Sequence, residues 1–253
     1  MKKIIILLVG LLLFTAVAGF SQDAGGVGIP FVDIGVRSAK GNDEVALSLQ
    51  LLLLLSIISL APSIIILATA FLRIAIVFDF VKRALSLQQV PPNQVLMGIA
   101  LFLTLFIMWP TLDTIYQKSF KPVADGKVGI DEMYQEAEKP LKVFMWKQMG
   151  NDTKNVELFL KMGNYPKPQT RGDVPIHVLI PAFVLHELTV AFWIGILLFI
   201  PFIIIDMVVA STLMSMGMIM LPPVMISMPF KLILFVMVDG WGLITMQLVR
   251  SFV

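Results

Sequence analysis

Apolar positions fill two long blocks of the chain, and a polar block separates them. Residues 46–110 are apolar except around the loop "DFVKRALSLQQVPPNQ", and residues 174–253 are apolar except for a few isolated charges. Apolar runs of this length are typical of membrane helices. The pattern predicts two hydrophobic helical hairpins, which we expect to be kinked or cut at Pro62, Arg73 and Pro201.

The polar block, residues 111–173, carries most of the charges, nearly balanced in sign. Helical spacing in "DEMYQEAEKPLKVFMWKQMG", followed by the breakers of "NYPKPQTRGD", predicts a small helical domain. The expected fold is therefore an all-α membrane protein, in which two kinked hydrophobic hairpins flank a small helical extracytoplasmic domain. Some apolar pieces are short for about 30 Å of hydrocarbon, so we expect helices buried against further copies of the chain.

The N-terminus has the pattern of a secretory signal peptide. Lys2 and Lys3 precede an apolar run, and the small-x-small sequence Ala16-Val17-Ala18 follows as a cleavage site. We therefore expect a cleavable signal peptide at 1–20. Residues 21–45 are rich in Gly and Asp and lack periodicity, which predicts a flexible extracytoplasmic arm.

The basic residues predict an orientation. With the mature N-terminus outside, Arg73, Lys82 and Arg83 fall at the cytoplasmic end of the first hairpin, as the positive-inside bias requires. The polar block then lies outside the cytoplasm, and the chain makes four nominal spans.

Composition narrows the class further. Of 253 residues, 58% are hydrophobic and 14% charged, and the mean hydropathy is +0.90, too apolar for an ordinary soluble domain. The net charge of +2 and the lack of a dense basic run argue against nucleic acid as a partner. The chain has no cysteine, which excludes disulfides, thiolate nucleophiles and cysteine-ligated metals.

Catalytic motifs are broken or missing. His186 and Glu187 open "HELTV", but Val190 stands where a zinc-protease motif needs its second histidine. The other histidine, His177, is nine residues earlier, about 180° away on a continuous helix. No nucleophile elbow or phosphate-binding loop is visible. We expect no enzyme activity, no catalytic residue, no metal and no cofactor.

Isolated ionisable residues in apolar surroundings are the first unusual feature. Each would be costly facing lipid, so each should find a partner or water. Asp206 and Lys231 flank one loop and are the natural ion pair, either as a structural clamp or as part of a proton relay. Arg73, Glu187 and Asp239 are the other ionisable residues expected to be buried.

The second unusual feature is "STLMSMGMIMLPP", residues 211–223. Methionine recurs at Met214, Met216, Met218 and Met220, a spacing of two that scatters side chains around a helix but aligns them on an extended segment. The pattern predicts a non-helical loop that lines a cavity. Packing of an irregular core by flexible methionines is the alternative.

Two double prolines suggest a duplicated unit. Pro91-Pro92 and Pro222-Pro223 each precede a long apolar stretch, as in the repeats of some transport proteins, although chance explains so short a likeness equally well.

The segments "RIAIVFDFVKRALSLQQVPPNQVLMGIALFLTLFIMWP" and "IPFIIIDMVVASTLMSMGMIMLPPVMISMPFKLILFVMVDGW", together with the signal peptide, resemble the FliP family of flagellar type III export gate proteins. The resemblance covers nearly all of the mature chain. It implies a homo-oligomer, a pentamer in this family, that assembles with FliQ and FliR into a closed helical gate for unfolded flagellar subunits. Further export proteins such as FlhB and FlhA, and a place in the flagellar basal body at the bacterial inner membrane, are implied in the same way.

The family's constriction loop usually carries a methionine triplet after glycine. The matching residues here are Met218, Ile219 and Met220 after Gly217, so the middle position departs from the family pattern. A ring of flexible methionines at the constriction could close on itself as a gasket, that is, an apolar seal. Ile is branched at Cβ and stiffer than Met but still apolar, which predicts that this seal is slightly less deformable.

Three alternatives remain open at this point. Injectisome export proteins share the same core, although the signal peptide and the polar insert favour the flagellar branch. An ion or proton transporter would need its acidic residues along a wet path. A scaffold would assemble without controlling permeability.

Overall fold

The computed structural model describes residues 42–218 and 220–252, and every regular element within them is helical. The prediction of an all-α fold is thereby confirmed. The expected signal peptide 1–20, nearly all of the arm 21–45, and Ile219 lie outside the described residues. The chain divides into two units, Met1–Leu52 and Leu53–Val253.

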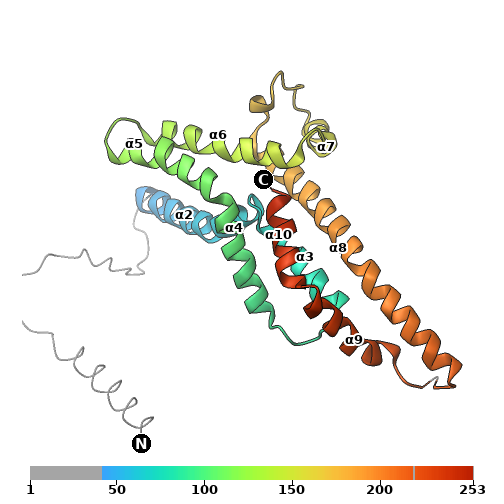
Figure 1. Ribbon diagram of the computed structural model, residues 1–253. Coiled ribbons are helices and arrows are strands. Elements are labelled where there is room, and N and C mark those ends of the chain that lie inside the picture. The colour runs from blue at the N-terminus through green and yellow to red at the C-terminus, as the bar shows by residue number, and fades with distance from the viewer. Residues whose placement is uncertain (1–41, 219, 253) are drawn as a thin grey trace, which may run out of the picture. The chain divides into compact units, whose positions relative to one another are not determined.

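The elements follow one another along the chain as shown in Figure 1. They are α2 (Asn42–Leu67), α3 (Phe71–Ala84), α4 (Asn93–Ile115), a π-helical turn (Tyr116–Phe120), α5 (Lys121–Ala124), α6 (Ile130–Met149), α7 (Lys154–Met162), a 3-10 turn (Arg171–Asp173), α8 (Ile176–Ser215), α9 (Pro223–Met237) and α10 (Gly240–Arg250).

The prolines do not cut the apolar runs, contrary to prediction. Helix α2 continues through Pro62, and α8 continues through Pro181 and Pro201 for 40 residues. A proline removes one N–H donor from the helix, and both long apolar helices tolerate that loss without a break. Arg73, also expected to interrupt an apolar run, lies inside α3 and does not break it.

The first apolar block breaks instead between α2 and α3, which splits it into three helices. The Thr69 hydroxyl donates to the Ile66 carbonyl at 2.8 Å and accepts the backbone N–H of Phe71 at 3.4 Å. A side chain that bonds the backbone on both sides competes with the helical ladder. The Thr69 side chain therefore bonds the backbone on both sides of the break.

The polar block begins inside a helix rather than at a linker. Helix α4 runs past residue 111, and the π-helical turn and α5 prolong it to Ala124. After a turn, α6 returns alongside this helix (Figure 1). Asp131 and Glu132 in the first turn of α6 interact favourably with the positive end of the helix dipole. Gly150, at a φ of 57°, ends the helix.

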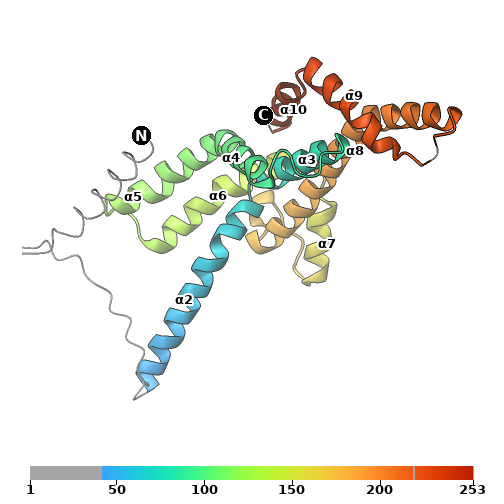
Figure 2. The ribbon, with the colours of Figure 1, turned by 90° about the horizontal axis from the view of Figure 1, so that it is seen from below.

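The polar block also shares the main hydrophobic core with the apolar blocks, so the expected small separate domain is not a unit of its own. Phe144, Met145 and Trp146 of α6 are buried in the same cluster as Phe78 of α3 and Phe183 of α8. Helix α3 lies along α8 at the centre of this cluster, and α4 packs on its other side (Figure 2). The amphipathic pattern of α6 is that of a helix covering a core.

A smaller cluster joins the end of α3 to the α8–α9 hairpin. Val81, Ala84 and Leu85 pack there with Phe202 of α8 and Phe235 of α9. Helices α9 and α10 meet at a bend of 63°. The small cluster holds the second apolar block against the first.

Among the described residues, three helices are long and apolar enough to cross a membrane: Leu49–Leu67, Asn93–Ala124 and Ile176–Ser215. The bent pair α9–α10 makes a fourth if it counts as one span, which matches the four spans expected. At 1.5 Å per residue, α8 is about 60 Å long, roughly twice the hydrocarbon thickness. The structure is therefore that of a membrane protein with at least one helix that extends well beyond the bilayer core.

Candidate functional site

The methionine-rich segment forms the turn between α8 and α9. Helix α8 ends at Ser215, and Gly217 takes a φ of 74°, a conformation that glycine adopts without steric cost. The N–H of Met218 donates to the Leu213 carbonyl and that of Gly217 to the Met214 carbonyl, both at 3.0 Å. This pair of bonds is a Schellman motif, which explains why the helix stops here.

The non-helical loop is shorter than the sequence predicts. Met214 lies in the last turn of α8 and Met216 at its C-cap, so among the described residues only 216–218 and 220–222 lie outside α8 and α9. Pro222 then caps α9, as Pro92 caps α4. Both double prolines therefore precede a helix, as expected, because proline fixes the backbone of a first turn and needs no N–H partner there.

All four described methionines of this loop are exposed. The exposed fractions are 66% for Met214, 61% for Met216, 48% for Met218 and 97% for Met220. They do not fill the core of this chain, which disfavours the packing interpretation within one subunit. Flexible, polarisable side chains on a tight turn are available to line a surface formed with other chains.

Asp206 and Lys231 lie near the base of the loop, and the structure brings them together. Lys231 Nζ donates to Asp206 Oδ2 at 2.7 Å, and it also donates to Ser86 Oγ at 3.0 Å and the Ala84 carbonyl at 3.2 Å. The Ser227 hydroxyl donates to Asp206 Oδ1. The side chain of Lys231 is 2% exposed and that of Asp206 30%.

This network ties three segments to one another. Lys231 lies on α9 and Asp206 on α8. Ala84 is the last residue of α3, and Ser86 lies in the loop that follows it. All three N–H donors of the ammonium group are used, so its burial is compensated. The arrangement fixes the α8–α9 hairpin, and with it the methionine loop, to the end of α3.

A second buried ion pair joins α3 to α8. Arg73 donates from Nε to Glu187 Oε2 at 2.7 Å and from Nη2 to Oε1 at 2.5 Å, and the two side chains are 3% and 0% exposed. The two parallel bonds form the bidentate geometry that makes arginine–carboxylate pairs strong and directional. The carboxylate of Glu187, the second residue of the broken zinc motif, therefore binds Arg73 through both of its oxygens.

Arg73 also holds the end of the described chain. Its Nη1 donates to the Ser251 carbonyl at 3.1 Å and to Ser251 Oγ at 3.0 Å, and its guanidinium lies 3.9 Å from the centre of the Phe252 ring. Gln148 of α6 donates to the Phe252 carbonyl at 3.1 Å. Segments from four parts of the chain therefore meet around one arginine.

Asp239 is exposed in this chain, which corrects the expectation that it is buried. It takes a left-handed φ of 51° between α9 and α10, and its carbonyl accepts the N–H of Leu243 at 3.0 Å. Asp239 is the N-cap residue of α10, where the chain turns between two helices, and its carboxylate lies over Gly242 rather than in the core.

The two histidines do not form a metal site. His177 Nε2 lies 2.8 Å from the Tyr165 hydroxyl, and His186 Nδ1 lies 3.7 Å from Asp152 Oδ2. Within residues 42–218 and 220–252, no three His, Asp or Glu side chains gather closely enough to hold a metal ion.

The segment before α8 is fixed by Asp173. The backbone N–H of Thr170 donates to Asp173 Oδ2 at 2.8 Å, and the Thr170 side chain bonds back to the turn. These bonds, the backbone one first, hold the pKa of Asp173 below its ordinary value of 3.8, and the nearby charge of Lys142 acts in the same direction.

Comparison with known proteins gives a consistent result. The sequence model of the FliP family matches residues 54–248. The chain is 57% identical to the flagellar biosynthetic protein FliP of Treponema denticola over 270 aligned positions covering 100% of both chains. It is 64% identical to that of Treponema pallidum, covering 93% of this chain and 87% of the relative.

A more distant relative extends the match. The flagellar biosynthetic protein FliP of Bacillus subtilis is 51% identical over 219 residues, which cover 87% of this chain and 98% of the relative. The matched region contains both buried ion pairs and the methionine loop. The chain belongs to the FliP family of flagellar export proteins.

Proposed function

We propose that this chain is a core subunit of the flagellar type III protein export gate, and that its methionine loop seals the channel entrance for unfolded flagellar subunits. The exposed methionines between α8 and α9 carry the proposal. Methionine has three rotatable bonds, so a ring of such loops can close on itself and reshape around varied passing side chains. An apolar constriction also dewets, which hinders ion leakage in the closed state.

The proposal includes the assembly that such a ring requires. Several copies of the chain, five by family resemblance, would surround the channel together with FliQ and FliR, in contact with FlhB and FlhA. The large apolar side chains exposed on α2, α4 and α8 suit burial between subunits. The assembly would lie at the basal body in the bacterial inner membrane.

The alternatives have less support. The relatives described above carry flagellar names, which disfavours an injectisome subunit. For a proton relay, Glu187 and Asp206 would have to be open to water along a path, but both are engaged in ion pairs. A clamp role for the two pairs fits these contacts better.

The test is a leak assay on cells that express the variant in place of the parent. Replacing Met218 and Met220 with alanine removes bulk from every copy in the ring, so ion or dye entry should rise while assembly of the complex is retained. Leucine at both sites restores volume and should leak less than alanine, but export of bulky subunits should fall because leucine reshapes less freely.

The matched control is Met162→Ala, which removes an exposed methionine at the end of α7, far along the chain from the loop. It should leave permeability unchanged. If the loop variant assembles and stays as tight as the parent, the gasket proposal is wrong.

A further inference from the structure

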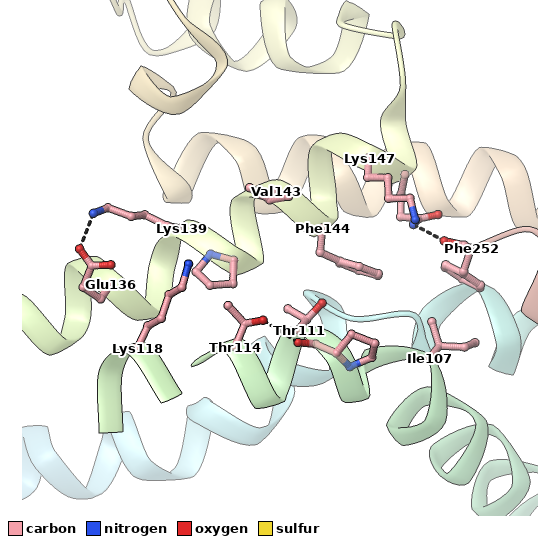
Figure 3. Close-up of a pocket in the computed structure, with 13 residues that line it drawn as sticks. Ile107, Thr111, Thr114, Lys118, Glu136, Lys139, Val143, Phe144, Lys147 and Phe252 are labelled. Atoms are coloured by element: carbon pink, nitrogen blue, oxygen red, sulfur yellow. Dashed lines mark hydrogen bonds and ion pairs between the residues drawn. The ribbon is translucent and has the colours of Figure 1, made fainter. Parts of the chain in front are cut away.

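A hollow of about 500 Å³ lies between α6 and the helix formed by α4 and its π-helical turn. Figure 3 shows its two walls facing each other, with Lys118 on one and Lys139 and Lys147 on the other. The floor is apolar and includes Ile107 and Phe144. The hollow therefore combines cationic groups at its edge with an apolar interior.

The charges of the hollow are not balanced within the described chain. Glu136 is the one carboxylate among the lining residues, and it already pairs with Lys139. Neither Lys118 nor Lys147 has a counter-charge among the ion pairs of residues 42–218 and 220–252, and both are exposed. The site thus carries a net positive charge that suits an anionic group.

The hollow also lies where α4 leaves the apolar layer. Val95 to Leu112 contains no charged residue, and these 18 residues span about 27 Å, close to the hydrocarbon thickness. The first charge, Asp113, follows directly, and the hollow is lined by residues 107–118 of this helix. The exposed rings of Trp109 and Tyr116 are of the kind that marks a membrane–water interface.

We infer that this hollow binds the headgroup of an anionic phospholipid. The headgroup lies in the hollow, with Lys118 on one wall and Lys147 on the other, and the start of an acyl chain rests on the apolar floor by Ile107 and Phe144. A lysine near a membrane surface strengthens the binding of an anionic lipid about 5-fold. The site is independent of the methionine loop and of the export role proposed above.

The test uses the full chain purified in dodecyl maltoside. Native mass spectrometry measures retention of dioleoylphosphatidylglycerol, and thermal melting measures the apparent dissociation constant as a lipid mole fraction. The parent should retain phosphatidylglycerol in preference to dioleoylphosphatidylcholine. Lys118→Gln with Lys147→Gln should weaken binding about 25-fold, at about 5-fold for each lysine. Glu136→Gln should strengthen it, because Lys139 loses its internal partner.

The control is Lys154→Gln with Lys161→Gln, which makes the same charge change on exposed lysines of α7, outside the hollow. It should bind like the parent. Equal weakening in both double variants would show that only overall charge matters and would overturn the site. An equal melting shift with inorganic phosphate alone would assign the hollow to free phosphate, and equal retention of phosphatidylcholine would exclude charge recognition; either result overturns the proposal. The lipid-free melting temperature of each variant checks that it is folded.

Discussion

The guanidinium of Arg73 and the carboxylate of Glu187 meet at two hydrogen bonds, although 114 residues separate them along the chain. Both side chains are almost completely buried. Truncating one partner of such a pair leaves the other charge buried without compensation. The pair therefore holds α3 against α8 at the centre of the main core.

Glu187→Ala should destabilise the chain by about 3–5 kcal/mol, because Arg73 would remain buried without its anion. Arg73→Lys keeps the charge but loses the bidentate geometry and the contacts with Ser251, so it should also destabilise the chain. Thermal melting of the purified protein in detergent measures both effects.

A matched control lies on the same helix. Arg83 and Asp79 of α3 form an ion pair at 2.7 Å, but their side chains are 70% and 44% exposed. Asp79→Ala should cost at most about 1 kcal/mol, since exposed pairs contribute little. Equal losses for Asp79→Ala and Glu187→Ala would show that burial does not set the strength of these pairs.

Lys231→Ala should disrupt folding or assembly, because Asp206 loses its cation and two further acceptors lose their donor. The swap of Asp206→Lys with Lys231→Asp should recover only part of the loss, since an aspartate at 231 cannot donate to the Ala84 carbonyl. The yield of folded complex after detergent extraction reports the outcome. Complete recovery by the swap would mean that the Ala84 and Ser86 contacts contribute nothing.

The Thr170–Asp173 turn should depend on pH. The pKa of Asp173 is lower in the folded chain than its ordinary 3.8, so its contribution is present above that value and is lost as the pH falls through the folded pKa. Asp173→Asn should reduce protection of the Thr170 amide from hydrogen exchange near neutral pH. The difference from the parent should shrink as the pH falls below 3.8 and through the lower folded pKa; a difference that stays constant on acidification would contradict the assignment.

The orientation of the polar block can be measured directly because the chain has no cysteine. Asp131→Cys, at an exposed position near the start of α6, should react with an impermeant thiol reagent in intact spheroplasts. Arg83→Cys, exposed at the end of α3, should react only after lysis. The opposite labelling pattern would reverse the topology.

The two buried ion pairs show what the sequence can and cannot predict. Asp206 and Lys231 flank one turn, so their pairing follows from a local pattern in an apolar background. The partner of Arg73 depends on how α3 docks on α8, and no spacing in the sequence encodes that contact. Ionisable residues in apolar surroundings, which the sequence does reveal, were the available signal for both.

The ends of the helices are likewise only partly predictable from the sequence. The apolar runs reveal the helices, but proline is a weak guide to their ends, because the helices continue through Pro62 and Pro201. The ends depend on bonds visible only in three dimensions, such as the hydroxyl of Thr69 and the positive φ of Gly217. The shared core of the polar and apolar blocks is equally non-local, since it arises from helix docking.

The uninterrupted course of α8 has a mechanical consequence. Glu187 anchors the helix in the main core, and Ser215, its last residue, is 28 positions further on, about 42 Å at 1.5 Å per residue. The lever is the far half of α8 together with α9 and the end of α3, which the Lys231–Asp206 network ties to it. Its fulcrum is the buried Arg73 pair, and the methionine turn is at its tip. A tilt of about 10° at the fulcrum would carry the tip about 7 Å sideways, so a small adjustment among the core helices is enough to move a channel lining by more than the width of a side chain.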